Sequence, residues 1–165
     1  MPTTPDLVIA PLDHEDAGEL LTLQRAAYAS EARLYDDPHL PALVQTFGGL
    51  VTELAGGTAL KAVRGHRIVG AVRARVESTR GVLHVSRLTV APDQQGHGIG
   101  RALLDAVERA APPDVRTAAL FTGERSAANL RLYARAGYVE RRREPLLGST
   151  NGVVLVHLVK DLPDR

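Results

Sequence analysis

The spacing of hydrophobic residues changes several times along this chain of 165 residues. A short apolar run at residues 7–10 predicts a first strand. Beyond it the spacing becomes helical, which predicts a helix whose inner face carries Leu20, Leu21, Leu23, Ala27 and Tyr28. Asp13 stands just before this helix, where its carboxylate can cap the first turn. A second helix is predicted around residues 43–50, ahead of the glycine pair at residues 56–57.

From residue 58 the pattern becomes one of strands rich in β-branched residues. Runs at residues 59–63, 68–76 and 82–90 are separated by short turn-like segments, so they predict a three-stranded antiparallel meander. On the third run, one face is expected to carry Val82, His84, Ser86, Leu88 and Val90, because side chains alternate along a strand.

The last part of the chain alternates between the two patterns. Helical spacing resumes at Ile99 and stops before two prolines at residues 112–113. A strand is predicted at residues 115–121, then a helix capped by Ser126 and ended by Gly137, and finally two strands near residues 138–142 and 153–159. The order β-α-α-β-β-β-α-β-α-β-β, with no internal repeat or linker, predicts a single α/β (α+β) domain over residues 1–165.

The composition is that of a soluble globular domain, with 44% hydrophobic and 24% charged residues and a formal net charge of +1. This near-neutral balance argues against a generic nucleic-acid-binding protein. The chain has no cysteine, which excludes disulfides, thiolate metal sites and a cysteine nucleophile, and no metal is expected. Residues 1–18 lack the basic and apolar parts of a signal peptide, and no apolar run is long enough to span a membrane. A cytoplasmic protein is therefore expected.

The most informative segment is a glycine-rich turn between the third strand of the meander and the next helix. It contains Gly96, Gly98 and Gly100, which allow the backbone to turn sharply and to approach a ligand closely. Free amides at a helix N-terminus, together with the helix dipole, form a site for a phosphate or pyrophosphate. A P-loop would require a lysine here, and a dinucleotide fold would require the G-x-G-x-x-G spacing in a first βαβ unit. Neither pattern is present.

The spacing Gln95-x-x-Gly98-x-Gly100 resembles the acetyl-CoA signature of the GNAT superfamily of N-acetyltransferases. The sequence Leu-Tyr-Ala-Arg-Ala-Gly-Tyr at residues 132–138 is similar to the Leu-Tyr-x-x-x-Gly-Phe/Tyr segment of that superfamily. Residues 27–31 and 122–126 also resemble a bacterial subgroup of it. The resemblance spans residues 7–159 and implies a GNAT-like fold, with a central mixed, mostly antiparallel sheet flanked by helices.

The resemblance further implies that acetyl-CoA is the co-substrate. Backbone amides of the glycine-rich turn would hold its pyrophosphate, and the end of the preceding strand would pair with its pantetheine arm. The residues assigned to acetyl-CoA in this way are Leu88, Thr89, Val90, Gln95, Gly96, His97, Gly98, Ile99, Gly100 and Arg101.

Tyr133 matches the tyrosine that acts as general acid in the superfamily, although its helical spacing alone would be typical of a core tyrosine. A phenol with a reference pKa near 10 stays protonated at neutral pH and can donate to a departing thiolate, whose conjugate thiol has a reference pKa of about 8.5. The general base stays open: His84 on the predicted central strand, Glu31 in a loop expected after the first helix, and Glu77 are all candidates.

A common superfamily pattern has an asparagine seven residues before the tyrosine, but this chain has Ser126 there. Asn129, one helical turn before Tyr133, is the other candidate for that contact with CoA, and Ser126 can instead simply cap the helix. The resulting prediction is an N-acetyltransferase that moves an acetyl group to a primary amine by direct attack in a ternary complex. The alternative is a non-catalytic acyl-CoA-binding or sensing module. The expected partner is a small-molecule or peptide amine, without nucleic acid or membrane, and the chain is expected to be a monomer or homodimer.

Overall fold

The computed structural model of the chain describes residues 6–149 and 151–164, so the first five residues of the N-terminal segment judged for a signal peptide lie outside the described residues. The strands of the sheet are β1 (Leu7–Pro11), β2 (Thr58–Arg64), β3 (Arg67–Glu77), β4 (Val82–Val90), β5 (Thr117–Gly123), β6 (Val139–Pro145) and β7 (Val154–Asp161). The helices are α1 (Ala17–Tyr35), α2 (Pro41–Val44), α3 (Phe47–Leu54), α4 (Ile99–Arg109) and α5 (Ala127–Arg135), with two short 3₁₀ turns, η1 (His14–Asp16) and η2 (Pro92–Gln94).

The seven strands form one sheet in the order β1-β2-β3-β4-β5-β7-β6. All neighbouring pairs are antiparallel except β4 and β5, which are parallel. The predicted mixed, mostly antiparallel sheet and the predicted meander of β2, β3 and β4 are therefore confirmed. The bounds of β4 are those that the hydrophobic pattern predicts.

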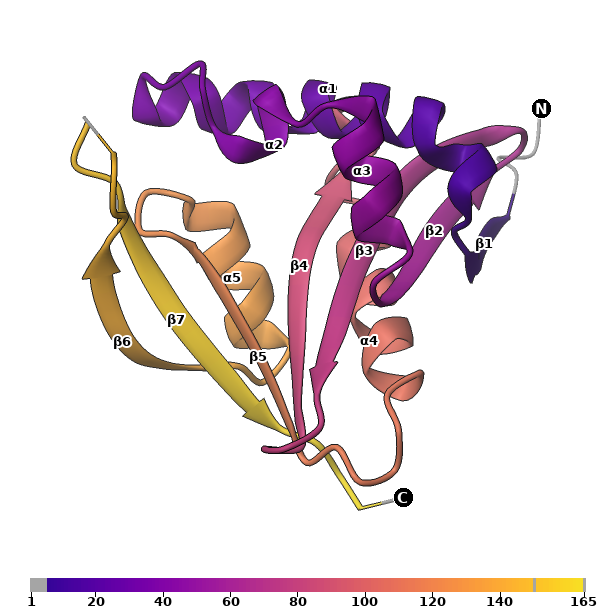
Figure 1. Cartoon of the computed structure of the whole chain (residues 1–165), viewed down its shortest axis with the longest axis vertical. Helices are drawn as coiled ribbons and strands as arrows, with labels where there is room; N and C mark the ends of the chain where they lie inside the picture. Colours follow the sequence, from indigo (N-terminus) through magenta and orange to yellow (C-terminus); the bar gives the residue numbers. More distant parts are fainter. Residues whose placement is uncertain (1–5, 150, 165) are drawn as a thin grey trace.

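Helices cover both faces of the sheet (Figure 1). Helices α4 and α5 bury Ile99, Leu103, Leu104 and Tyr133 in the larger core cluster on one face. On the other face, α1 and α3 form a second cluster with the first half of the sheet, centred on Leu20 and Leu50. Both clusters exclude apolar surface from water, which is the main force that holds the layers together.

A glycine in β3 brings α4, and with it the glycine-rich turn, close to the sheet. A Cβ at Gly70 would lie 2.9 Å from Leu103 Cδ1 and 3.0 Å from Ile99 Cγ2. Only a residue without a side chain permits this approach. Within the described residues, no helix is both long and apolar enough to cross a membrane.

The structure corrects two predictions about the first helices. Helix α1 continues to Tyr35, so Glu31 lies within the helix rather than in a loop after it. The reason is that residues 29–34 are mostly good helix formers. The predicted second helix is two helices, because Thr46 accepts a hydrogen bond from the Gly49 amide at 3.1 Å and caps a new helix there. The predicted cap at Asp13 is confirmed, and it forms a capping box with Asp16.

Candidate functional site

Strands β4 and β5 separate soon after they pair. Their hydrogen-bonded register covers only Val82 with Thr117, Leu83 with Ala118, and His84 with Ala119. Both strands continue beyond this point and diverge, as Figure 1 shows. In the described part of the chain, the edge of β4 that faces β5 therefore has no strand partner from Val85 to Val90. This edge offers free backbone groups to an extended ligand.

A β-bulge distorts β4 at the point where the strands have separated. Arg73 is opposite Ser86, but Ala71 is opposite Thr89, so β4 contains an extra residue at this point. Arg87 has a φ of +50°, in the left-handed region that costs a residue with a side chain about 1–2 kcal/mol. Such strain persists only where the surrounding structure holds it, and it is concentrated at functional sites.

The bulge overturns the prediction that residues 82 to 90 alternate regularly. Leu88 and Val90 pack against the core cluster that contains Leu83 and Val85, so they do not share the face of His84 and Ser86. The extra residue shifts the alternation by one position, which moves every later side chain to the opposite face.

The glycine-rich turn has the geometry of an anion-binding helix start. Gly96 and Gly98 have φ values of +78° and +77°, and a Cβ on either would meet no atom within 4 Å. The first intrahelical bond of α4 runs from the Ala102 amide to the Gly98 carbonyl, so the amides of Ile99, Gly100 and Arg101 have no intrahelical partner. This cradle of backbone amides, open where a Cβ would stand, fits a pyrophosphate.

Other residues of the turn have structural roles as well. A Cβ at Gly100 would lie 3.2 Å from Leu132 Cδ2, so this glycine allows α4 and α5 to pack closely. The Gln95 side chain donates to the Val90 carbonyl at 3.4 Å, and a ring nitrogen of His97 lies 3.2 Å from the Gln94 carbonyl.

The Arg101 side chain is engaged within the molecule, because it pairs with Asp105 at 2.9 Å and donates to the Arg135 carbonyl at 3.0 Å. Its backbone amide is the part of Arg101 that faces the turn. Thr89 is buried, and its hydroxyl donates to the Ala71 carbonyl at 3.4 Å.

Tyr133 is buried, with 6% of its surface exposed. Its ring meets that of Tyr138 edge to face, with the ring centroids 5.9 Å apart. Burial raises the pKa of Tyr133 well above the usual value of a phenol, and the neighbouring Tyr28 and Glu31 groups raise it further. The phenol therefore keeps its proton, and Glu31 lies near enough to act on it electrostatically.

Glu31 is held where the end of α1 meets the turn between β5 and α5. The Ser126 hydroxyl donates to Glu31 Oε2 at 2.6 Å, and Tyr35 Oη lies 3.5 Å from Ser126 Oγ. The Arg125 amide donates to Tyr35 Oη at 2.8 Å. Ser126 stands at the N-cap position just before α5, but its hydroxyl does not cap the helix as predicted, because it is bonded to Glu31 instead.

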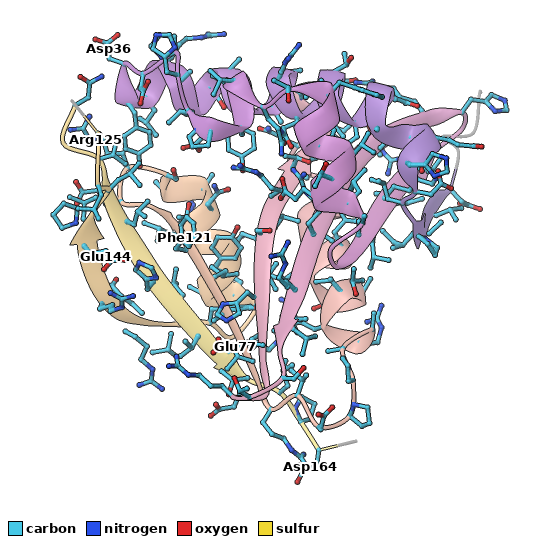
Figure 2. All side chains as sticks on the ribbon, viewed as in Figure 1. Asp36, Glu77, Phe121, Arg125, Glu144 and Asp164 are labelled. Atoms are coloured by element: carbon cyan, nitrogen blue, oxygen red, sulfur yellow. The ribbon has the colours of Figure 1, made fainter. Side chains whose placement is uncertain are left out.

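Asn129, the alternative to Ser126, donates from its side-chain amide to Thr122 Oγ1 at 3.4 Å. His84 lies elsewhere, near the closed end of the two strands. Its Nε2 is 2.8 Å from Glu77 Oε2, and about half of its side chain is exposed. In Figure 2, Glu77 lies near the lower end, where β4 and β5 meet, whereas Arg125 lies at the upper end, where they have separated.

The structure thus places Glu31 within electrostatic range of Tyr133, although the two are far apart in the sequence, and adds Tyr28, Arg87 and Phe121, none of which the sequence marked as a site residue. Burial raises the pKa of Tyr28, and the Arg87 guanidinium beside it opposes that rise. Phe121 of β5 is 57% exposed on the open face of the sheet (Figure 2). No sequence motif marked Tyr28 or Arg87 as a site residue, because the bulge in β4 is what places Arg87 beside Tyr28. Among the described residues, no group of three or more histidine or acidic side chains could hold a metal ion.

Comparison with known proteins places this site in a family. A family model described as an acetyltransferase (GNAT) domain matches residues 49–162. The chain therefore belongs to the GNAT acetyltransferases.

Solved structures of the same fold agree with this assignment. The ribosomal-protein-S18-alanine N-acetyltransferase from Escherichia coli has a TM-score of 0.78 and 17% identity, over 97% of this chain and 96% of that one. YncA from Salmonella typhimurium, solved with its cofactor acetyl-CoA, has a TM-score of 0.77 and 16% identity, over 97% and 96% of the two chains. The PaiA N-acetyltransferase from Thermoplasma acidophilum, in complex with coenzyme A, has a TM-score of 0.76 and 15% identity, over 95% and 99%. At these identities the likeness concerns the fold.

Proposed function

We propose that the protein is an acetyl-CoA-dependent N-acetyltransferase that acts on a primary amine, with Tyr133 as general acid and Glu31 as general base. The observation that carries this proposal is that Glu31, bonded to Ser126 just before α5, lies within electrostatic range of the buried Tyr133 on the same helix. A candidate proton donor and a candidate proton acceptor are thereby on the side of the molecule where the facing edges of β4 and β5 lack partners in the described residues.

Acetyl-CoA would be held by two backbone elements. The amides from Gln95 to Arg101 suit its pyrophosphate, and the unpaired edge of β4 around Leu88, Thr89 and Val90 suits the amide groups of its pantetheine arm. When bound, acetyl-CoA supplies a thioester whose acetyl group passes to the amine while the CoA thiolate departs. The two neighbouring structures solved with acetyl-CoA or coenzyme A support this choice of ligand.

Two proton transfers accompany that reaction. Ser126 occupies Oε2 of Glu31, which leaves Oε1 without a hydrogen-bond partner among the described residues and available to take a proton from the amine, directly or through water. Tyr133 remains protonated because burial raises its pKa, so it can donate a proton to the departing thiolate. Direct attack of the amine needs no covalent enzyme intermediate, in keeping with the absence of cysteine.

The role of Tyr133 is tested by steady-state assays of thiol release, with an acceptor found in a screen of amines. Tyr133→Phe should lower kcat by about 10²–10⁴, the usual contribution of general acid catalysis, with the Kd for acetyl-CoA unchanged. Equal turnover by the original protein and Tyr133→Phe at every pH would exclude the acid role.

The role of Glu31 is tested against the other candidate bases in the same assay. Glu31→Gln should lower kcat by a similar factor, while His84→Gln, which removes an exposed side chain bound to Glu77, should change it by about twofold at most. The opposite result would identify His84 as the base. A protein that binds acetyl-CoA but releases no thiol with any amine would instead be the non-catalytic acyl-CoA-binding module.

A further inference from the structure

A ring of polar side chains, of which Arg73 and Gln24 are buried, fixes Arg73 of β3 beneath α1 and α3. One guanidinium nitrogen of Arg73, Nη2, donates to Gln24 Oε1. The Gln24 amide in turn donates to the Ala42 carbonyl at 2.8 Å and to Gln45 Oε1 at 2.9 Å, and Gln45 donates to Glu53 Oε2. Gln24 is fully buried and Arg73 is 5% exposed. The orientation of the guanidinium is therefore set before any ligand binds.

The other end of this guanidinium forms an ion pair but, among the described residues, no hydrogen bond. Arg73 Nη1 is buried and lies 3.3 Å from Glu53 Oε2, but it makes no hydrogen bond within the described part of the chain. Burial lowers the pKa of Arg73, Glu53 opposes this effect, and the nearby Arg87 adds to it. The ion pair with Glu53 leaves Nη1 without a hydrogen bond to any described residue, and the positive charge of Arg73 would favour an anion in the space beside it.

Arg73 borders a hollow of about 410 Å³, counting its open mouth, on the face of β4 that carries Ser86. The residues that define it are Glu53, Gly56, Gly57, Arg73, Arg75 and Ser86. The Arg75 guanidinium lies over Gly56, where a Cβ would come within 2.9 Å of Nη2. No carboxylate of residues 6–149 or 151–164 lies within ion-pair distance of Arg75, so the hollow contains two arginines and a single acid, Glu53.

We propose that this hollow binds the carboxylate of the acceptor, and that the acceptor is a small amino carboxylate of the kind represented by free amino acids. This inference rests on the proposed function. A guanidinium pair recognises a carboxylate through charge-assisted hydrogen bonds, and Ser86 adds a hydroxyl donor. Ser86 lines the hollow and directly precedes the bulge, so the hollow lies beside the part of β4 whose edge towards β5 has no strand partner in the described residues. A polyamine would instead place a second ammonium beside two arginines, and the repulsion between these like charges would disfavour its binding.

The test compares each free amino acid with its carboxamide, which has nearly the same size but no negative charge. With the original protein, kcat/KM from thiol release should be at least about tenfold higher for the acids than for the carboxamides. Arg75→Gln, an exposed position that should not affect folding, should reduce this ratio by about tenfold and leave the Kd for acetyl-CoA unchanged. Arg116→Gln, which removes an exposed arginine paired with Asp164, is the charge-matched control and should preserve the ratio.

Binding is measured in parallel by calorimetry, with the same acids and carboxamides added to the protein saturated with CoA. Turnover of amines without preference for the acid, or a ratio unchanged by Arg75→Gln, would overturn the inference while the proposed function stands. Acid-dependent binding without thiol release would support the hollow and contradict the enzymatic proposal. Absence of both binding and turnover for every acid would overturn the inference.

Discussion

Replacement of Gly98 by alanine tests the proposed pyrophosphate site with a change that the free protein can accommodate. Gly98 precedes α4 with a φ of +77°, and a Cβ there meets no atom within 4 Å. The cost to folding therefore comes from the left-handed backbone alone, about 1–2 kcal/mol. For a domain of this size, that corresponds to a decrease in Tm of about 2–8 °C.

The expected effect on binding is larger than the effect on folding. The new methyl group would occupy the space in front of the helix amides and would keep the pyrophosphate from at least one of them. Loss of one charge-assisted hydrogen bond costs about 1.5–3 kcal/mol. Because about 1.4 kcal/mol corresponds to a tenfold change, calorimetry should show acetyl-CoA bound about 10- to 150-fold more weakly.

Gly148→Ala provides the matched control. Gly148 has a φ of +81° and an equally open Cβ position, but it lies between β6 and β7, away from the glycine-rich turn. This variant should lose similar stability and keep its affinity for acetyl-CoA. The reasoning is refuted if Gly98→Ala binds acetyl-CoA within about twofold of the original protein, or if Gly148→Ala loses as much affinity.

Three further predictions concern stability and pH. A Cβ at Gly57 would lie 2.4 Å from a backbone carbonyl of β3, so Gly57→Ala should lower the free energy of unfolding by about 1–3 kcal/mol. Gly48 lies on α3 with open space around it, so Gly48→Ala should raise the free energy of unfolding by about 0.5–1 kcal/mol. Urea denaturation measures both changes. Because burial raises the pKa of Tyr133, its ionisation should cause no fall in kcat between about pH 8 and 10; an alkaline fall that Tyr133→Phe abolishes would contradict this. Burial tends to raise the pKa of Asp16. The hydrogen bonds that its carboxylate accepts from Lys61 at 2.6 Å and from the Asp13 backbone amide outweigh this effect, so the net pKa is lowered. The stability that this pair contributes should be present above the usual pKa of an aspartate and lost as pH falls through the lowered value, and Asp16→Asn should remove that dependence in denaturation curves.

Much of the fold could be predicted from the spacing of residues along the chain. The bounds of β4, the capping role of Asp13 and the helix after the glycine-rich turn all follow from short-range patterns. Such patterns are local, because side-chain periodicity and capping depend on residues a few positions apart. The glycine-rich turn is of this kind, since its glycines and its helix are adjacent in sequence.

The arrangement of the candidate catalytic groups could not be predicted in this way. The bulge at Arg87 contains no glycine from which it could have been predicted, and it moves Leu88 and Val90 to the opposite face from the one expected. Glu31 was expected in a loop, but the helix that contains it brings its carboxylate to Ser126. These outcomes depend on contacts between segments far apart in the chain.

The sequence by itself therefore determined most of the succession of strands and helices, the resemblance to the family and the position of the glycine-rich turn. The tertiary structure alone decided which carboxylate lies within electrostatic range of Tyr133, where β4 and β5 separate, and which guanidinium of β3 is bonded to Gln24. The physical reason is that periodicity and capping act within one or two turns of chain, whereas the register of a sheet and the packing of helices upon it are set by the whole core.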